Sequence, residues 1–71
     1  MILAFDVSKT KLPDWVRWVA QDQDGIWWAY EVEPLQFHKG WHENEVGQNK
    51  RLGQGIEPKD FKKMLERVNT A

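Results

Sequence analysis

The chain has 71 residues, of which 41% are hydrophobic and 30% are charged, and its formal net charge is −1. A chain of this length forms one domain at most, residues 1–71, and its near-neutral charge disfavours a dedicated nucleic-acid binder, which would carry an excess of Lys and Arg. Because the sequence contains no cysteine, disulfides, thiolate metal sites and thiol nucleophiles are excluded.

The apolar stretches are short. The longest, residues 2–5 and 26–30, fall far below the roughly 20 residues that a membrane span needs, and no charged leader precedes them. We therefore expect a soluble, unprocessed protein with no membrane partner. Its core must come from a few large side chains, because the sequence contains five Trp, three Phe and one Tyr.

The first segment, residues 2–7, is apolar and rich in strand formers, and the polar residues 8–11 interrupt it. This pattern predicts an N-terminal strand. Pro13 then favours an extended connector at Leu12 that leads into the next element.

The strongest structural signal is a hairpin over residues 15–33. Two runs rich in aromatic and β-branched residues flank a polar connection that ends in Asp24 and Gly25. Asp-Gly favours a tight turn, because glycine accepts the positive φ that such turns require. With Gly25 in that conformation, Asp22 pairs with Ile26. The further pairs predicted by this register are Gln21 with Trp27, Ala20 with Trp28, Val19 with Ala29, Trp18 with Tyr30, Arg17 with Glu31 and Val16 with Val32.

The stretch 35–56 is rich in glycine and polar residues. We expect one or two further strands there: one near residues 41–47, then a turn about residues 48–49 and a short return through Leu52.

The C-terminal segment has the pattern of a helix. Pro58 suits the first helical position, Asp60 lies in the first turn, and Arg67 lies near the far end of the dipole. The apolar residues recur at helical spacing: Phe61, Met64, Leu65 and Val68. The whole sequence thus predicts an α+β fold, in which a small antiparallel sheet of the N-terminal strand, the hairpin over 15–33 and one or two further strands carries a C-terminal helix packed on one face.

Catalytic and metal-binding patterns are weak. His38 and His42 have the spacing of two ligands on a helix, but Gly40 between them disfavours a helix, and no third ligand completes a site. Ser8 has no histidine near it in the sequence, and the glycine-rich stretch matches no phosphate-binding motif. We expect neither an enzyme nor a metal or other cofactor.

A nucleic-acid interface is one alternative. Basic residues of the second half could form a face on which Trp41 stacks bases, although the acidic residues among them favour a solvated surface. The candidate residues are Lys50, Arg51, Lys59, Lys62, Lys63 and Arg67.

A protein interface is the favoured alternative. The register places Trp18, Trp28 and Tyr30 on one face of the hairpin, and a second group of aromatic and charged residues on the other. An open face with Trp and Arg is typical of binding hot spots, unless the glycine-rich stretch folds over it. The candidate partner-binding residues are Trp15, Arg17, Trp27, Glu31 and Trp41.

The hairpin also carries a family resemblance. Its pattern W-x-A-x-D-x-D-G-x-W-W-x-Y-E-x-x-P, followed by Gly40-Trp41 and an amphipathic C-terminal segment, resembles small tryptophan-rich proteins encoded by bacteriophages and prophages. The likeness covers most of residues 12–68. Because the members of this group are mostly uncharacterised, the resemblance assigns no functional residue.

The resemblance does imply a context, because small phage proteins without catalytic groups commonly bind one host protein. On that basis we expect a monomeric, non-enzymatic regulator in the host cytoplasm that binds RNA polymerase and modulates transcription by occlusion or displacement, whether by inhibiting initiation or by antitermination. The alternatives are a nucleic-acid-binding accessory protein, an inhibitor of a host defence nuclease and a structural virion component.

Overall fold

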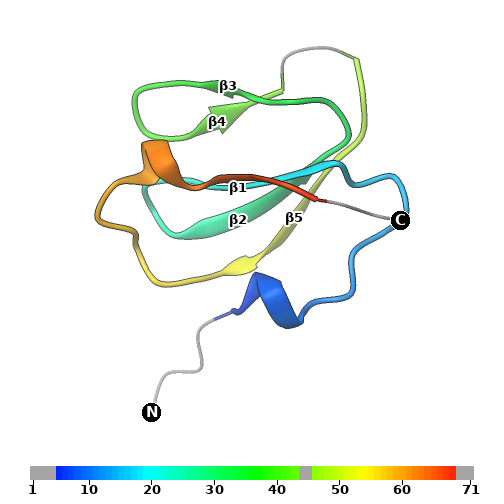
Figure 1. The fold of residues 1–71 in the computed structure, drawn as a ribbon. Coiled ribbons are helices and arrows are strands. Elements are labelled where there is room, and N and C mark those ends of the chain that lie inside the picture. The colour runs from blue at the N-terminus through cyan, green and yellow to red at the C-terminus, as the bar shows by residue number, and fades with distance from the viewer. Residues whose placement is uncertain (1–4, 44–45, 69–71) are drawn as a thin grey trace.

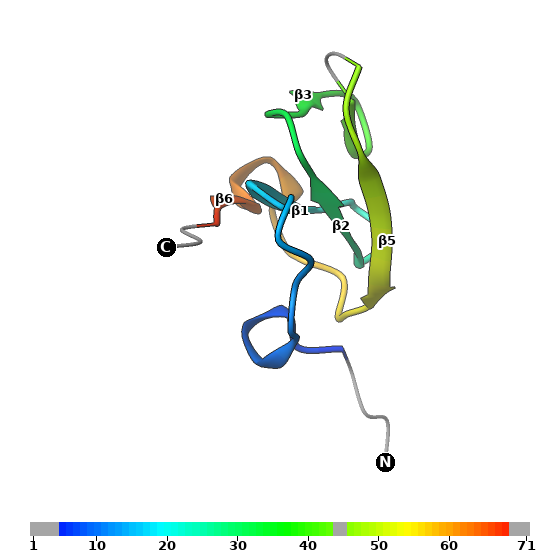
Figure 2. The ribbon, with the colours of Figure 1, turned by 90° about the vertical axis from the view of Figure 1, so that its right-hand side faces the viewer.

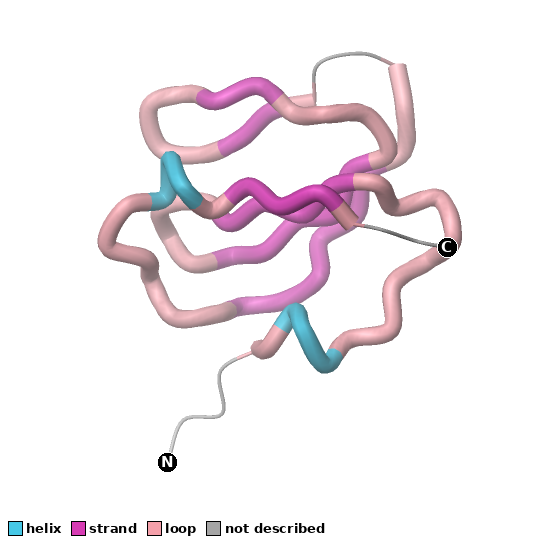
Figure 3. The backbone as a smooth tube through the Cα atoms, in the orientation of Figure 1, coloured by secondary structure: helices cyan, strands magenta, loops and turns pink. Residues whose placement is uncertain are grey.

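The computed structural model describes residues 5–43 and 46–68. Strands dominate this part of the chain, and its two helical segments are single 3-10 turns of three residues each (Figures 1 and 3). The elements in chain order are η1 (Val7–Lys9), β1 (Trp18–Gln21), β2 (Ile26–Tyr30), β3 (Leu35–Gln36), β4 (Trp41–His42), β5 (Asn49–Gln54), η2 (Phe61–Lys63) and β6 (Leu65–Arg67). The predicted α+β class is therefore wrong, and the described fold is mostly β.

The central hairpin is confirmed together with its register. Gly25 adopts a φ of 92°, and the Asp22 N–H donates to the Ile26 carbonyl at 3.0 Å. The Asp24 carboxylate also accepts the Ile26 N–H at 3.0 Å, which closes the turn. The pairs in the structure are Trp18 with Tyr30, Val19 with Ala29, Ala20 with Trp28 and Gln21 with Trp27.

The regular pairing begins at Trp18. The N–H of Arg17 donates to the Tyr30 carbonyl at 2.9 Å, and the N–H of Glu31 donates to the Gln48 carbonyl at 2.9 Å. The two further predicted pairs, Arg17 with Glu31 and Val16 with Val32, lie outside the paired residues.

The strands form two sheets. The larger has the antiparallel order β5-β2-β1-β6, and β5 contains a bulge opposite Trp27 and Trp28. The smaller consists of β3 and β4. Figures 1 and 2 show the β3–β4 hairpin on one side of β1 and β2 and η1 on the other.

The predicted C-terminal helix does not form. After η2 the chain becomes β6, which pairs antiparallel with β1. An isolated helix of this length is marginal in water, whereas the free edge of β1 offers backbone partners to an extended chain. The apolar residues of the predicted helix are divided between the two faces of the larger sheet. Leu65 packs toward Ala20 and Phe61, while Met64 and Val68 pack on the opposite face.

The predicted N-terminal strand is not found in the described residues. Residues 2–4 of that prediction lie outside the described part of the chain. Phe5 makes one sheet-like hydrogen bond, from its N–H to the Gln54 carbonyl at 2.9 Å. Asp6 then caps η1, because its carboxylate accepts the Ser8 N–H at 3.0 Å and so stops the extended chain.

The described residues of the stretch 35–56 form three strands rather than one or two. β4 begins at Trp41 as expected, but it ends at His42. Where a turn was predicted at residues 48–49, the chain enters β5, the longest strand. Gly53 lies in this strand, and a Cβ there would lie 2.5 Å from Cδ1 of Phe5, so the absence of a side chain allows Phe5 to pack closely on β5.

Two clusters fill the two faces of the larger sheet. The first core consists of Val16, Val19, Trp27 and Ala29, on which Phe5, Val7, Leu12, Trp15, Leu52, Met64 and Val68 pack. The second core consists of Ala20, Tyr30, Trp41 and Phe61, with Trp18, Trp28 and Leu65 against it. The alternation of side chains along β1 and β2 separates the two clusters.

Candidate functional site

Hydrogen bonds fix the β3–β4 hairpin to the larger sheet. A carboxylate oxygen of Asp22 accepts the Trp41 N–H at 2.9 Å, and the indole N–H of Trp41 donates to the Gln21 carbonyl at 3.1 Å. Tyr30 donates its hydroxyl to the Trp41 carbonyl at 3.3 Å. Gly40 allows this approach, because a Cβ there would lie 2.6 Å from the Asp22 oxygen.

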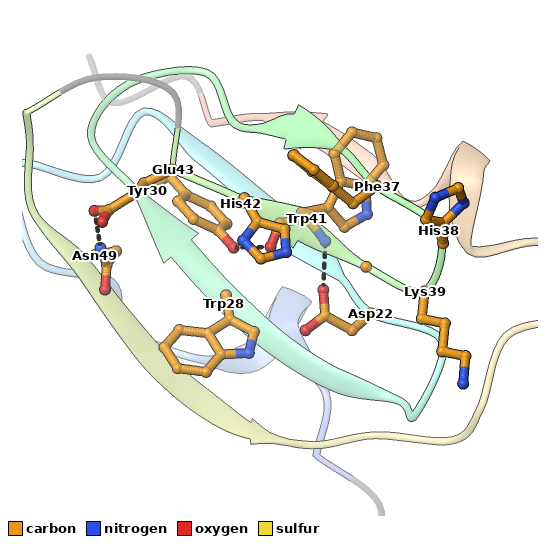
Figure 4. A pocket seen from close by; sticks show the side chains of 11 residues that line it. Asp22, Trp28, Tyr30, Phe37, His38, Lys39, Trp41, His42, Glu43 and Asn49 are labelled. Atoms are coloured by element: carbon orange, nitrogen blue, oxygen red, sulfur yellow. Dashed lines mark hydrogen bonds between the residues drawn. The ribbon is translucent and has the colours of Figure 1, made fainter.

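Between this hairpin and the sheet lies a cleft of about 670 Å³, which we call the aromatic cleft. Its size falls in the roughly 300–1,000 Å³ range of small-ligand sites. The lining residues are Asp22, Trp28, Tyr30, Phe37, His38, Lys39, Gly40, Trp41, His42, Glu43 and Asn49 (Figure 4). They come from β2, β4 and β5, from the β1–β2 and β3–β4 connections and from the residue after β4, so the cleft exists only in the folded protein.

The rings of the cleft differ in accessibility. Tyr30 and Trp41 are buried and belong to the second core, while Trp28 is partly buried. Phe37 is 49% exposed, and its ring lies 4.3 Å from the His42 imidazole, centroid to centroid. The cleft thus has buried rings at its base and exposed rings at its entrance.

Carboxylates lie on both sides of these rings. Figure 4 shows Asp22 on one side of Trp28 and Tyr30, and Glu43 on the other. Glu43 accepts a hydrogen bond from the Asn49 amide at 2.7 Å. Arg51 faces Trp28 across the β2–β5 pairing and is exposed.

Burial affects two ionisable groups of the cleft. Desolvation raises the pKa of Asp22 above its ordinary value of 3.8, and the neighbouring Asp24 adds to this rise, although the Trp41 N–H and His42 oppose it. Desolvation also raises the pKa of Tyr30 far above its ordinary value of 10, so its hydroxyl remains protonated and donates to Trp41. Among the described residues, no cluster of three or more His, Cys, Asp or Glu could hold a metal ion.

The five predicted partner-binding residues do not share one surface. Trp27 is buried in the first core, whereas Trp41 is buried in the second core on the other face. Trp15 packs partly buried on the first core. Arg17 is exposed, and its guanidinium donates to the Asp14 carbonyl at 2.7 Å. Glu31 is exposed and accepts the Gln48 N–H at 2.9 Å.

The predicted basic residues are likewise divided. Lys50 and Arg51 lie in β5, and Arg67 lies in β6, at the opposite edge of the sheet. The guanidinium of Arg67 lies 6.0 Å from the Trp18 ring centroid. The remaining three, Lys59, Lys62 and Lys63, are exposed in or near η2.

Most of the cleft was not predicted from the sequence. Trp41 was a predicted partner-binding residue, and His38 and His42 were considered only as a weak pair of metal ligands. Trp28 was placed with Trp18 and Tyr30 on one face of the hairpin, and Asp22 in the turn. Their shared position depends on the β3–β4 hairpin folding back on the sheet, which no local pattern signals.

Comparison with known proteins adds no relative: no protein-family model, curated protein or solved structure matches the chain. In the described residues, no helix combines the length and apolar character needed to cross a bilayer.

Proposed function

We propose that the protein is a non-enzymatic binding module that holds a segment of a partner protein in the aromatic cleft. The observation that carries this proposal is the cleft itself, a preformed cavity of about 670 Å³ with exposed rings at its entrance. Aromatic side chains supply much of the binding energy in protein interfaces, because they bury large areas with few rotatable bonds.

The polar groups of the cleft favour binding over catalysis. Asp22 accepts the Trp41 N–H, Glu43 accepts the Asn49 amide, and the Tyr30 hydroxyl donates to a carbonyl. These hydrogen bonds hold the walls in place. A preorganised wall lowers the entropy that binding costs, which favours recognition of an extended segment.

The partner class follows from the family resemblance. Because small phage proteins without catalytic groups commonly bind one host protein, we propose a host protein as the partner, and RNA polymerase is the first candidate to test. On this proposal the module occupies a surface of the polymerase and alters transcription by occlusion. The sequence suggested the hairpin face around Trp27 as the partner-binding surface. The aromatic cleft replaces it in this proposal, because Trp27 is buried in the first core, with 8% of its surface exposed.

Nucleic acid is the second candidate, favoured by one observation: the exposed Arg51 is the cross-strand partner of Trp28, which lines the cleft. A base could stack on the indole while the guanidinium binds phosphate. The carboxylates of Asp22 and Glu43 oppose this reading, since they line the same cavity and repel phosphate.

A matched pair of variants tests the proposed function. Phe37 lines the cleft and Leu35 does not, yet both lie in or beside β3 and are 49% and 48% exposed. Binding is measured to purified bacterial RNA polymerase and to an unbiased peptide library. We expect Phe37→Ala to weaken binding at least about tenfold, which corresponds to ~1.4 kcal/mol, and Leu35→Ala to leave it unchanged.

Three results would count against this proposal. The first is that neither the polymerase nor any peptide binds the protein, and the second is that the two variants bind alike. The third is that single-stranded DNA or RNA binds with an affinity that falls steeply with salt. The last result would favour the nucleic-acid alternative, and Arg51→Gln would then weaken binding.

A further inference from the structure

We propose that the aromatic cleft receives a cationic side chain, the lysine or arginine of a protein partner. This inference rests on the proposed function and specifies the chemistry of the segment that is bound. Its basis is the combination of ring faces and flanking carboxylates in one cavity.

The rings provide the first part of the argument. An ammonium or guanidinium within about 6 Å of an aromatic ring centre is attracted by the electron-rich face, and tryptophan gives the strongest attraction. Trp28 is partly buried at the cleft, with Tyr30 beside it and Phe37 at the entrance (Figure 4). The same sheet face already holds one such contact, in which Arg67 lies 6.0 Å from the Trp18 ring centre.

The carboxylates provide the second part. Asp22 and Glu43 lie on either side of the rings, and Lys39 is the only lysine or arginine that lines the described cleft. An adjoining depression, which shares Asp22 and Lys39 with the cleft, adds the carboxylates of Asp24 and Glu57 at the Asp22 side. A cation in the cleft would therefore meet a ring face and a carboxylate together, whereas an anion would meet two carboxylates and a single lysine.

The desolvation of Asp22 supports the same ligand. Its carboxylate is partly buried, which raises its pKa, and its one described hydrogen bond comes from a backbone N–H. A cation placed near it would compensate for the hydration that the carboxylate has lost. Arg51 acts in the opposite sense, because its charge beside Trp28 repels an entering cation.

The direct test uses three blocked tripeptides, acetyl-Gly-X-Gly-amide, with lysine, norleucine or glutamate at X. Binding is followed by NMR at the indole N–H of Trp28, at peptide concentrations up to about 10 mM, because one side chain yields affinities in the millimolar range. We expect the lysine peptide to bind about tenfold more tightly than the norleucine peptide, and the glutamate peptide not to bind.

Charge variants keep the shape of the cleft. Asp22→Asn retains an oxygen for the Trp41 N–H, and Glu43→Gln retains one for the Asn49 amide. Each should weaken the lysine peptide several-fold, whereas Arg51→Gln should tighten it. Glu66→Gln is the matched control, because it removes the same charge from the other face of the sheet, beside Val19. If Asp22, Glu43 and Arg51 affected only the structure of the cleft, their variants would not change the affinity for the lysine peptide in opposite directions.

The outcomes separate this inference from the proposed function. If the norleucine peptide binds as tightly as the lysine peptide, if no peptide perturbs Trp28, or if a nucleoside monophosphate binds instead, the cation site is overturned. If library peptides bind in the cleft without a preference for lysine or arginine, the protein-binding function stands and the cation site fails. If lysine alone binds but no protein or library peptide does, the cation site stands and the proposed function fails.

Discussion

The two faces of the larger sheet are covered by different kinds of contact. On the first face, side chains from the N-terminal segment and from β5 pack on Trp27, and the amide of the buried Gln21 beside it donates to the Gly25 and Ile56 carbonyls. On the second face, four hydrogen bonds hold the β3–β4 hairpin. Trp41 takes part in three of them, with Asp22, Gln21 and Tyr30. The fourth joins the Gln23 N–H to the Lys39 carbonyl. Mainly apolar packing covers the first face, where a depression of about 350 Å³ lies beside Trp27, whereas the hydrogen-bonded hairpin on the second face leaves room for the larger aromatic cleft.

This difference separates the main source of stability from the proposed binding site. The first core supplies hydrophobic burial, which is the main stabilising term in a chain of this size. The second face supplies polar groups at fixed positions, which is what recognition requires. Substitutions on the two faces should therefore have different consequences.

The largest effect is expected at Trp27, whose neighbour Trp28 points to the other face. Trp27→Ala removes a buried ring and should cost about 3–5 kcal/mol, which equals the whole stability expected of so small a domain. The variant should be unfolded at 25 °C by circular dichroism. Trp28→Ala should remain folded, because Trp28 is only partly buried. A folded Trp27→Ala protein would contradict the assignment of the first core as the main source of stability.

The next effect is expected at Gly53, where the N-terminal segment meets β5. A Cβ at this position would lie 2.5 Å from Cδ1 and 2.8 Å from Cγ of Phe5, so Gly53→Ala must displace that ring. Overpacking of this kind costs about 1–3 kcal/mol. Urea unfolding measures the loss, and Phe5→Ala combined with Gly53→Ala should show less than additive destabilisation. Additive losses would mean that the two side chains do not compete for the same space.

These positions also show how far the sequence can predict the fold. The β1–β2 hairpin and its register were predicted because Asp24 and Gly25 fix the turn, and the alternation of side chains admits one register. Both signals are local. The C-terminal helix was predicted on equally local grounds, but the residues at helical spacing also alternate well enough to serve both faces as a strand. The segment forms a strand rather than a helix because the free edge of β1 offers it backbone partners, and no local sequence pattern reveals that edge.

The cleft depends even more on distant contacts. Asp22 and Trp41 are 19 residues apart, and their hydrogen bond places the hairpin over the sheet. From the sequence, Asp22 is a turn residue and Gly40 a loop glycine. Only the structure shows that a side chain at Gly40 would collide with Asp22. The candidate site could thus be predicted only as a concentration of aromatic residues.

A smaller effect is expected from Trp41→Phe, which acts on the second face alone. The substitution keeps a ring in the second core but removes the indole N–H that binds the Gln21 carbonyl at 3.1 Å. The unpaired carbonyl should cost about 1–2 kcal/mol. Hydrogen exchange should quicken at the Trp41 N–H and in the β3–β4 hairpin, while protection of β1 and β2 persists. Uniform loss of protection would mean that the two faces unfold as one unit.

The smallest effect is a pH dependence at Asp22. Because burial raises its pKa above 3.8, the folded protein holds this proton over a range in which the unfolded chain has lost it. The stability contributed by this group is therefore full below 3.8 and is lost as the pH rises through the folded pKa. Asp22→Asn removes the titration and keeps the acceptor for Trp41, so its stability relative to the unchanged protein should increase as the pH rises through this window.

Asp6 provides the control of opposite sign for this titration. The hydroxyl and the N–H of Ser8 both donate to its carboxylate and lower its pKa. Its contribution is thus present above the unfolded pKa and is lost as the pH falls through the folded one. Urea unfolding of Asp6→Asn and Asp22→Asn is measured between pH 3 and pH 7, in roughly one-unit steps. Relative to the unchanged protein, the stability of Asp6→Asn should fall as the pH rises, whereas that of Asp22→Asn should increase. Parallel pH profiles would mean that Asp22 is not desolvated, and the proposed preference of the cleft for a cation would then lose one of its supports.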